Sequence, residues 1–102
     1  MSIDLKEPLL REVRHILKEH VPHCEVWVFG SRIGKCAKPF SDLDLAIVSR
    51  SAVPVRTMAL LADAFEESDL PIKVDLVDLQ STNPAFQERI AGDHEVIFSP
   101  EG

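Results

Sequence analysis

Two aspartates, Asp42 and Asp44, are separated by one residue at the start of an apolar segment, residues 43–48. Side chains two residues apart in a strand lie on the same face, so the two carboxylates are expected side by side. Neighbouring carboxylates repel each other unless a cation lies between them, and a site made of oxygen ligands favours Mg²⁺ or Mn²⁺. The spacing therefore predicts a divalent metal site at the beginning of this strand.

A third aspartate, Asp75, lies within another apolar segment, residues 72–77. Alternate side chains of a strand point to opposite faces, so Asp75 lies on the face away from Val74 and Leu76. These apolar side chains then form the core behind Asp75, which can face the first two aspartates. Asp78 has the opposite parity and lies where the strand gives way to a loop, so we expect it to be a turn or capping residue.

A Gly-Ser pair, Gly30 and Ser31, follows the apolar run at residues 25–29. Glycine permits a close approach of the backbone, and the serine adds a hydroxyl donor to the backbone N–H groups at the end of the strand. Such a loop can hold the outer phosphates of a nucleoside triphosphate. Arg32 is a further candidate phosphate ligand, although a solvated loop face would explain it equally well.

Three carboxylates facing a phosphate-binding loop define an arrangement for in-line displacement at phosphorus with two metal ions. One ion lowers the pKa of the attacking hydroxyl, and the other stabilises the pyrophosphate leaving group. Asp75 is expected to bind the ion on the nucleophile side and to help remove the hydroxyl proton. The predicted catalytic residues and metal ligands are Asp42, Asp44 and Asp75, and the predicted phosphate-binding residues are Gly30, Ser31 and Arg32.

Spacing argues against two other phosphate or metal motifs. Residues 30–35 resemble a P-loop, but three residues instead of four separate the glycines, and Cys36 stands where Ser or Thr should bind Mg²⁺. A zinc site would need ligand pairs at usual spacings, which this region does not provide with its histidines and cysteines: His20, His23, Cys24 and Cys36. Trp27 and Phe29 are expected in the core rather than on a base-stacking surface.

The chain has 102 residues, of which 45% are hydrophobic and 27% charged, as expected for one globular domain spanning residues 1–102. No apolar run approaches the roughly 20 residues of a membrane helix, and the N-terminus lacks the basic and apolar regions of a signal peptide. Two cysteines are too few for a disulfide scaffold. We therefore expect a cytoplasmic protein without membrane contact.

Charge is unevenly distributed along the chain. Residues 1–40 carry seven Lys and Arg against five Asp and Glu, whereas residues 41–102 carry four against twelve, a net charge of −8. This distribution argues against strong direct binding of nucleic acid. An acidic second half suits divalent cations or a basic protein partner.

Helical and strand patterns alternate along the chain. Pro8 favours a helix start, Pro22 ends that helix, and Asn83 before Pro84 is a good N-cap. The predicted elements are helices at 7–21, 54–68 and 84–91, the last with Gly92 as C-cap, and strands at 25–29, 43–48, 72–77 and 95–98. Their order predicts an α/β (α+β) fold, with a small mixed β-sheet flanked by helices.

Three segments together resemble the minimal nucleotidyltransferases of the DNA polymerase beta superfamily: VFGSR at 28–32, SDLDLAI at 41–47 and KVDLVD at 73–78. The resemblance extends from about Leu9 to Phe98. It implies the nucleotidyltransferase fold, with ATP or another nucleoside triphosphate as co-substrate and Mg²⁺ or Mn²⁺ as cofactor. In this family Ser31 would contact phosphate, and the three aspartates would ligate the metal.

Members of this family are often encoded beside a helical toxin of the HEPN class, act as its antitoxin, and in some cases attach AMP to it. The resemblance therefore implies a protein adenylyltransferase whose partner is a HEPN-type protein encoded nearby, in a homodimer or hetero-oligomer. A second hypothesis is a non-catalytic antitoxin that neutralises its partner by binding alone. The chain departs from the family pattern at Ile33-Gly34-Lys35, where a basic residue commonly precedes glycine, so the loop path is not predicted.

Overall fold

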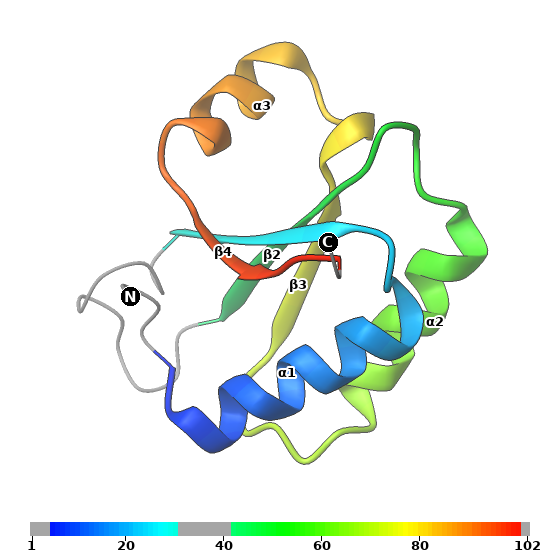
Figure 1. Cartoon of the computed structure of the whole chain (residues 1–102), viewed down its shortest axis with the longest axis vertical. Coiled ribbons are helices and arrows are strands. Elements are labelled where there is room, and N and C mark those ends of the chain that lie inside the picture. Colours follow the sequence, from blue (N-terminus) through cyan, green and yellow to red (C-terminus); the bar gives the residue numbers. More distant parts are fainter. Residues whose placement is uncertain (1–4, 31–41, 101–102) are drawn as a thin grey trace.

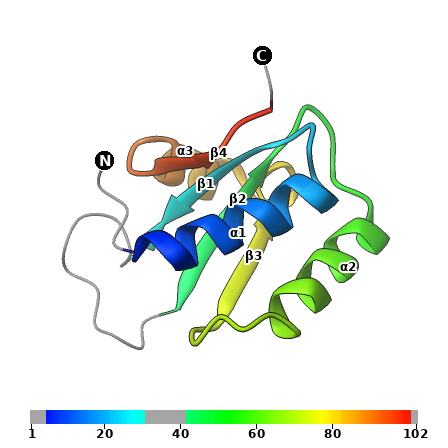
Figure 2. The same ribbon diagram turned by 60° about the horizontal axis from the view of Figure 1, so that its bottom comes forward.

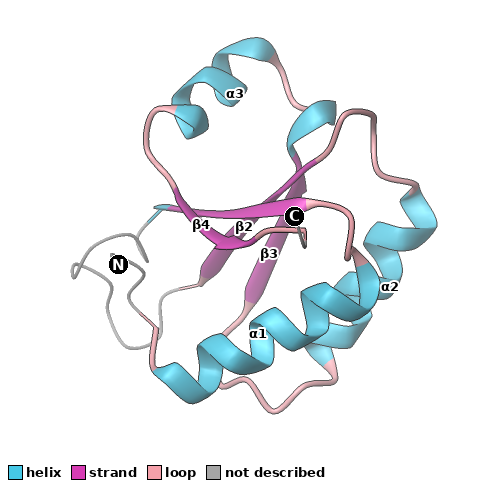
Figure 3. Cartoon of the chain, in the orientation of Figure 1, coloured by secondary structure: helices cyan, strands magenta, loops and turns pink. Residues whose placement is uncertain are grey.

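A computed structural model describes residues 5–30 and 42–100 and shows a β-sheet with helices on both of its faces (Figures 1 and 3). The elements of this part of the chain are α1 (Glu7–His20), β1 (Glu25–Phe29), β2 (Leu43–Val48), α2 (Val55–Glu66), β3 (Val74–Asp78), the 3-10 helix η2 (Leu79–Ser81), α3 (Pro84–Ala91) and β4 (Glu95–Phe98). The predicted α/β (α+β) fold is confirmed, and β1, β2, α3 and β4 have the predicted bounds.

The sheet has the strand order β3-β2-β1-β4. β1 pairs antiparallel with β2 and with β4, whereas β2 and β3 run parallel. Parallel pairing requires a crossover connection, which α2 provides. α1 and α2 lie on one side of the sheet and α3 on the other (Figures 1 and 2). The sheet is therefore mixed, as the order of the elements predicts.

Strand β2 lies at the centre of the core. Its residues Leu45, Ala46 and Ile47 have no exposed surface. Leu45 and Ile47 pack in the main apolar cluster with residues of α1 and α2, whereas Ala46 belongs to a smaller cluster with Ile90 of α3. A strand that is covered on both faces needs a nearly continuous apolar sequence, so a charged residue within it, Asp44, requires a special explanation.

Helix α1 is bounded by two prolines and covers the sheet with one apolar stripe. Pro8 lies in the first turn, where its missing N–H removes no helical hydrogen bond, and Pro22 directly follows the C-cap residue, Val21. The buried stripe has helical spacing and consists of Leu10, Val13, Ile16 and Leu17.

Strand β3 differs from the prediction at both ends. It begins at Val74 rather than at residue 72, because its partner strand begins with Leu43, which is paired with Val74. Its last residue is Asp78, and the 3-10 helix η2, which the sequence does not predict, follows directly. The sequence pattern identifies the apolar segment, but the length of the neighbouring strand fixes its start.

The carboxylate of Asp78 explains why the chain turns after β3. It accepts hydrogen bonds from the backbone N–H of Gln80 at 3.2 Å and from the Ser81 hydroxyl at 2.9 Å, and so caps η2. It also accepts a bond of 2.8 Å from the N–H of Val53, in the segment before α2. The predicted capping role of Asp78 is confirmed.

Helix α2 is shorter than the predicted 54–68. Pro54 is its N-cap, and its last residue is Glu66. Both the N–H and the hydroxyl of Ser68 donate to the Phe65 carbonyl, at 3.2 and 2.6 Å, so the chain closes in a tighter turn and leaves the helix.

Asp78→Ala should lower the free energy of unfolding by about 1–2 kcal/mol, because it removes the cap of η2 and leaves the Val53 N–H without its acceptor. Urea unfolding measures the change. Asp63→Ala, at an exposed position on α2, is the control and should stay within about 0.5 kcal/mol of the wild type. Equal stability of the two variants would contradict a stabilising role for the hydrogen bond between Asp78 on β3 and Val53 before α2.

Candidate active site

The parallel pairing of β2 with β3 places Asp44 directly opposite Asp75. Residues opposite each other in adjacent strands have their side chains on the same face of the sheet. On its other side, Asp44 is paired with Phe29, the last residue of β1. The structure thus brings two of the predicted site residues to neighbouring positions, where β1 ends and β2 begins.

Asp42 is exposed and directly precedes β2, two residues before Asp44. Burial raises the pKa of Asp44 above its ordinary value of 3.8, and the charges of Asp75 and Asp42 raise this pKa further. Burial disfavours a charge because solvation is lost, and each neighbouring carboxylate disfavours a further negative charge by repulsion. The three carboxylates therefore form one electrostatically coupled group around Asp44.

Gly30 lies beside the carboxylate of Asp44. Its φ angle is +81°, a conformation that residues with a side chain rarely adopt. A Cβ atom at this position would lie 2.5 Å from Oδ2 of Asp44, too close for either atom to remain in place. Glycine is therefore required here for its backbone conformation and for the close approach of a site carboxylate.

The Asp75 carboxylate has a cationic neighbour that the sequence interpretation did not single out. Oδ1 lies 3.5 Å from Nζ of Lys73, with side chains that are 42% and 72% exposed, so this ion pair adds little stability. The signal in the sequence is the spacing of two residues, which places Lys73 and Asp75 on one face.

The strands bring the three aspartates to neighbouring backbone positions, but their carboxylates are not gathered at one point. Within residues 5–30 and 42–100, no group of three or more His, Cys, Asp or Glu side chains is gathered closely enough to hold a metal ion. The backbone register and the mutual repulsion around Asp44 link the three aspartates, while the carboxylate of Asp75 contacts Lys73.

The other predicted phosphate ligands, Ser31 and Arg32, lie outside the described residues. The same holds for the departure from the family pattern at residues 33–35 and for Cys36. Of the predicted phosphate-binding loop, the structure describes Gly30 alone.

Trp27 and Phe29, which were expected in the core, are partly buried and pack against the smaller apolar cluster. The Trp27 ring stacks on the ring of His94 with centroids 3.8 Å apart, and Phe29 contacts Phe86 of α3 edge to face at 5.9 Å. The Trp27 indole N–H also donates to the carboxylate of Glu25. These contacts hold α3 and the chain after it against the sheet, so the aromatic rings have a structural role.

Residues 11–101 match the family described as polymerase beta, nucleotidyltransferase. This chain belongs to the polymerase beta nucleotidyltransferase family. It is also 43% identical over 100 residues to a probable protein adenylyltransferase, MntA, from Haemophilus influenzae, an alignment that covers 98% of this chain and 88% of that relative. The predicted family is confirmed.

Solved structures of toxin–antitoxin complexes share the fold of this chain. A toxin–antitoxin complex with AMP-PNP superposes with a TM-score of 0.73 at 22% identity, over 90% of this chain and 74% of the matched one. A tri-AMPylated Shewanella oneidensis HEPN toxin in complex with MNT antitoxin gives a TM-score of 0.68 at 18% identity, over 93% and 73%. At these identities the likeness establishes the nucleotidyltransferase fold.

All three aspartates of the candidate site lie within the part of the chain that matches the nucleotidyltransferase family. In the segments that the structure describes, no helix has the length and apolar character needed to cross a membrane.

Asp44→Asn should stabilise the protein near neutral pH, because it removes a charge that burial and two neighbouring carboxylates disfavour. We expect the Tm to rise by a few degrees, equivalent to at most about 1 kcal/mol. The folded-state pKa of Asp44 is raised, so the penalty exists above that pKa and disappears as the pH falls below 3.8.

Thermal unfolding of the wild type and of Asp44→Asn between about pH 7 and pH 3 measures this difference. It should shrink as the pH is lowered. Asp69→Asn, at an exposed position beyond α2, is the control and should show no such trend. An Asp44→Asn variant that is less stable than the wild type at neutral pH would contradict the repulsion.

Proposed function

We propose that this protein is a protein adenylyltransferase, which transfers AMP from ATP to a hydroxyl group of a partner protein. The observation that carries the proposal is the register of β2 and β3, which sets Asp75 opposite Asp44 beside Gly30 in a member of the nucleotidyltransferase family. The 43% identity to a probable protein adenylyltransferase supports AMP as the transferred group and a protein as the acceptor.

The reaction is an in-line displacement at the α-phosphorus of ATP. The acceptor hydroxyl oxygen forms a new bond to this phosphorus, and the bond from phosphorus to the pyrophosphate oxygen breaks. Asp75 accepts the hydroxyl proton or passes it to solvent, because it lies at the outer strand of the site with an exposed side chain. On the other side, the Gly30-Ser31 backbone and Arg32 bind the phosphates, and Asp42 and Asp44 would hold the cation that offsets the phosphate charge.

The donor set of the site fits a divalent cation. The three side chains offer only carboxylate oxygens, which Mg²⁺ and Mn²⁺ prefer. Burial, and after it the charges of Asp75 and Asp42, raises the pKa of Asp44, and a cation would offset this penalty on the Asp44 charge. Asp42, Asp44 and Asp75 would hold the ion, which would neutralise the phosphate charge and favour ionisation of the acceptor hydroxyl. We propose Mg²⁺, with Mn²⁺ as a substitute.

The proposed partner is a HEPN-type protein encoded nearby, with which this chain forms a cytoplasmic toxin–antitoxin complex. Two observations support this partner. The matched structures include an MNT antitoxin bound to an AMPylated HEPN toxin. The acidic second half of this chain suits a toxin surface that is basic near the modified hydroxyl.

The transfer reaction tests the proposal. Incubation with the purified HEPN-type partner, Mg²⁺ and ATP labelled at the α-phosphate should label the partner, whereas ATP labelled at the γ-phosphate should not. Asp75→Asn should lower the labelling rate by a factor of about 100 or more, because it removes the group that handles the proton. Asp78→Asn, on the same strand but opposite in parity, should stay within about fivefold of the wild type, because its carboxylate caps η2.

A tight complex that transfers no label, whichever nucleoside triphosphate is supplied, would replace the enzyme by an antitoxin that acts through binding alone. Loss of labelling in Asp78→Asn with full labelling in Asp75→Asn would move the active carboxylate to the other face of β3.

A further inference from the structure

β3 is an edge strand with an open backbone. Among the described residues its only strand neighbour is β2, and all five residues of β3 are partly exposed. The Lys73 carbonyl accepts a hydrogen bond from the N–H of Leu43 on β2, at 2.9 Å. In a parallel ladder alternate residues bond to the same neighbour, so Lys73, Asp75 and Val77 direct their backbone groups toward β2. The backbone N–H and C=O groups of Val74 and Leu76 therefore point away from the sheet.

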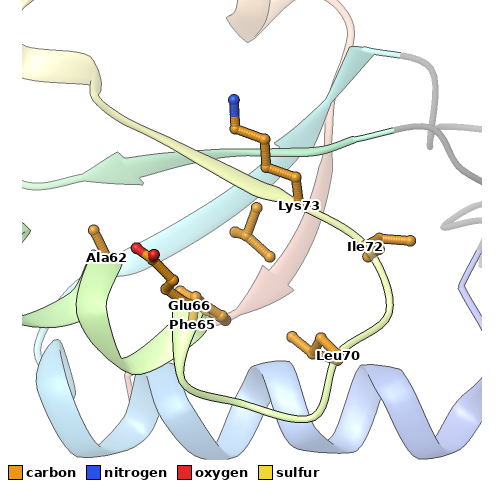
Figure 4. Close-up of a pocket in the computed structure, with 7 residues that line it drawn as sticks. Ala62, Phe65, Glu66, Leu70, Ile72 and Lys73 are labelled. Carbon is orange, nitrogen blue, oxygen red and sulfur yellow. The ribbon is translucent and has the colours of Figure 1, made fainter.

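A groove runs beside this edge, between β3 and α2. It consists of two hollows, of about 460 and 480 Å³, that share Ala62 and Val74 in their walls. The first hollow lies between the end of α2 and the chain leading into β3, where Figure 4 shows Ala62, Phe65 and Leu70 around it. The second lies along the first turns of α2 and is lined by Val55, which is 85% exposed, together with Met58, Ala59, Asp75 and Leu76.

The groove borders the candidate active site along β3, and its first hollow is lined by one carboxylate, Glu66, and one cation, Lys73. Asp75 lines its second hollow and has the other site residue, Asp44, as its strand partner. Glu66 lies on the α2 wall of the first hollow, and Ile72 lies across the hollow from it (Figure 4). An apolar groove with an open strand edge, a carboxylate on the wall of one hollow and a catalytic carboxylate on the opposite face of the same strand suits an extended peptide segment. Its side chains on the groove face would be apolar, with a basic one near Glu66.

We propose that the acceptor protein binds here by adding an extended segment to the open edge of β3, with the hydroxyl-bearing residue opposite Asp75. This inference rests on the proposed AMP transfer and assigns the surface that selects the acceptor. The backbone of the segment pairs with the outward groups of Val74 and Leu76. A residue opposite Asp75 has its side chain on the same face as Asp75, so the hydroxyl reaches the carboxylate that handles its proton.

The period of two in a strand then fixes the chemistry of the neighbouring positions. The residues immediately before and after the hydroxyl-bearing one lie opposite Val74 and Leu76, and their side chains enter the groove. They are therefore apolar. The residue three positions away lies opposite Ile72 on the groove face, where a long basic side chain can extend across the hollow toward Glu66.

A short peptide tests this docking mode without ATP. The probe is a fluorescein-labelled peptide, Lys-Gln-Val-Thr-Val-Gln-Lys, which has apolar residues beside the threonine and lysines three positions away. The control peptide, Lys-Val-Gln-Thr-Gln-Val-Lys, has the same composition but carries glutamines at the positions that face the groove. Fluorescence anisotropy should show saturable binding of the first peptide and binding of the second that is weaker by about tenfold or more.

A matched pair of variants locates the site. Ala62→Arg puts a long cationic side chain between the two hollows and should weaken binding by about tenfold or more. Ala91→Arg makes the same exchange at an exposed position of α3, on the other face of the sheet, and should change the affinity by less than about twofold. Bound peptide should also slow hydrogen exchange at the outward amides of Val74 and Leu76.

The docking proposal would be overturned if no saturable binding were seen at millimolar peptide, or if Ala62→Arg bound the peptide as well as the wild type does. It would also be overturned if, without peptide, hydrogen exchange at the amides of Val74 and Leu76 slowed as the protein concentration rose. The last result would mean that the open edge of β3 pairs with a second copy of this chain. Because none of these measurements involves ATP, their failure leaves AMP transfer standing. Conversely, normal peptide binding without any labelling of the HEPN-type partner would refute the transfer and leave the docking surface.

Discussion

The site depends on the parallel pairing of β2 with β3. Because side chains alternate along a strand, a shift of one residue in this register would turn Asp75 toward α1 and α2 and expose the apolar Val74 and Leu76. β2 is buried on both faces, so its position is fixed by packing, and α2 returns the chain to the outer edge in the same direction. The core therefore specifies the geometry of the carboxylates.

A carboxylate in the central strand is tolerated because it lies at the strand's open end. Asp44 is half-buried, and the conformation of Gly30 leaves room for its Oδ2 atom. The raised pKa of this group means that the fold carries an electrostatic strain in this region, which burial and the neighbouring carboxylates impose. Such strain is common where a protein is built to bind a cation or to transfer a proton. The apolar groove beside β3, which we propose as the acceptor surface, borders the strand that carries Asp75.

Strand parity and proline positions were enough to predict most of the elements and to expect that Asp75 can face Asp42 and Asp44, because these are local patterns. The register that pairs Asp44 with Asp75 depends on how β2 and β3 come together and was not predicted. The start of β3, the early end of α2 and the helix η2 could not be predicted, since they depend on the length of β2 and on hydrogen bonds made by Ser68 and Asp78. The contact between Lys73 and Asp75 and the groove arise from side-chain and tertiary packing. The roles of Ser31 and Arg32 stay predictions.

The most direct test of the account is where a divalent ion binds. Mn²⁺ added in small amounts to the isotopically labelled protein with ATP should broaden, by its unpaired electrons, the amide signals of Gly30, Asp44 and Asp75 before others. The broadening should weaken strongly in Asp44→Asn. Broadening centred on the acidic end of α2, near Glu66 and Asp69, or broadening at the three strand positions that persists in Asp44→Asn, would contradict a metal site set by the register of β2 and β3.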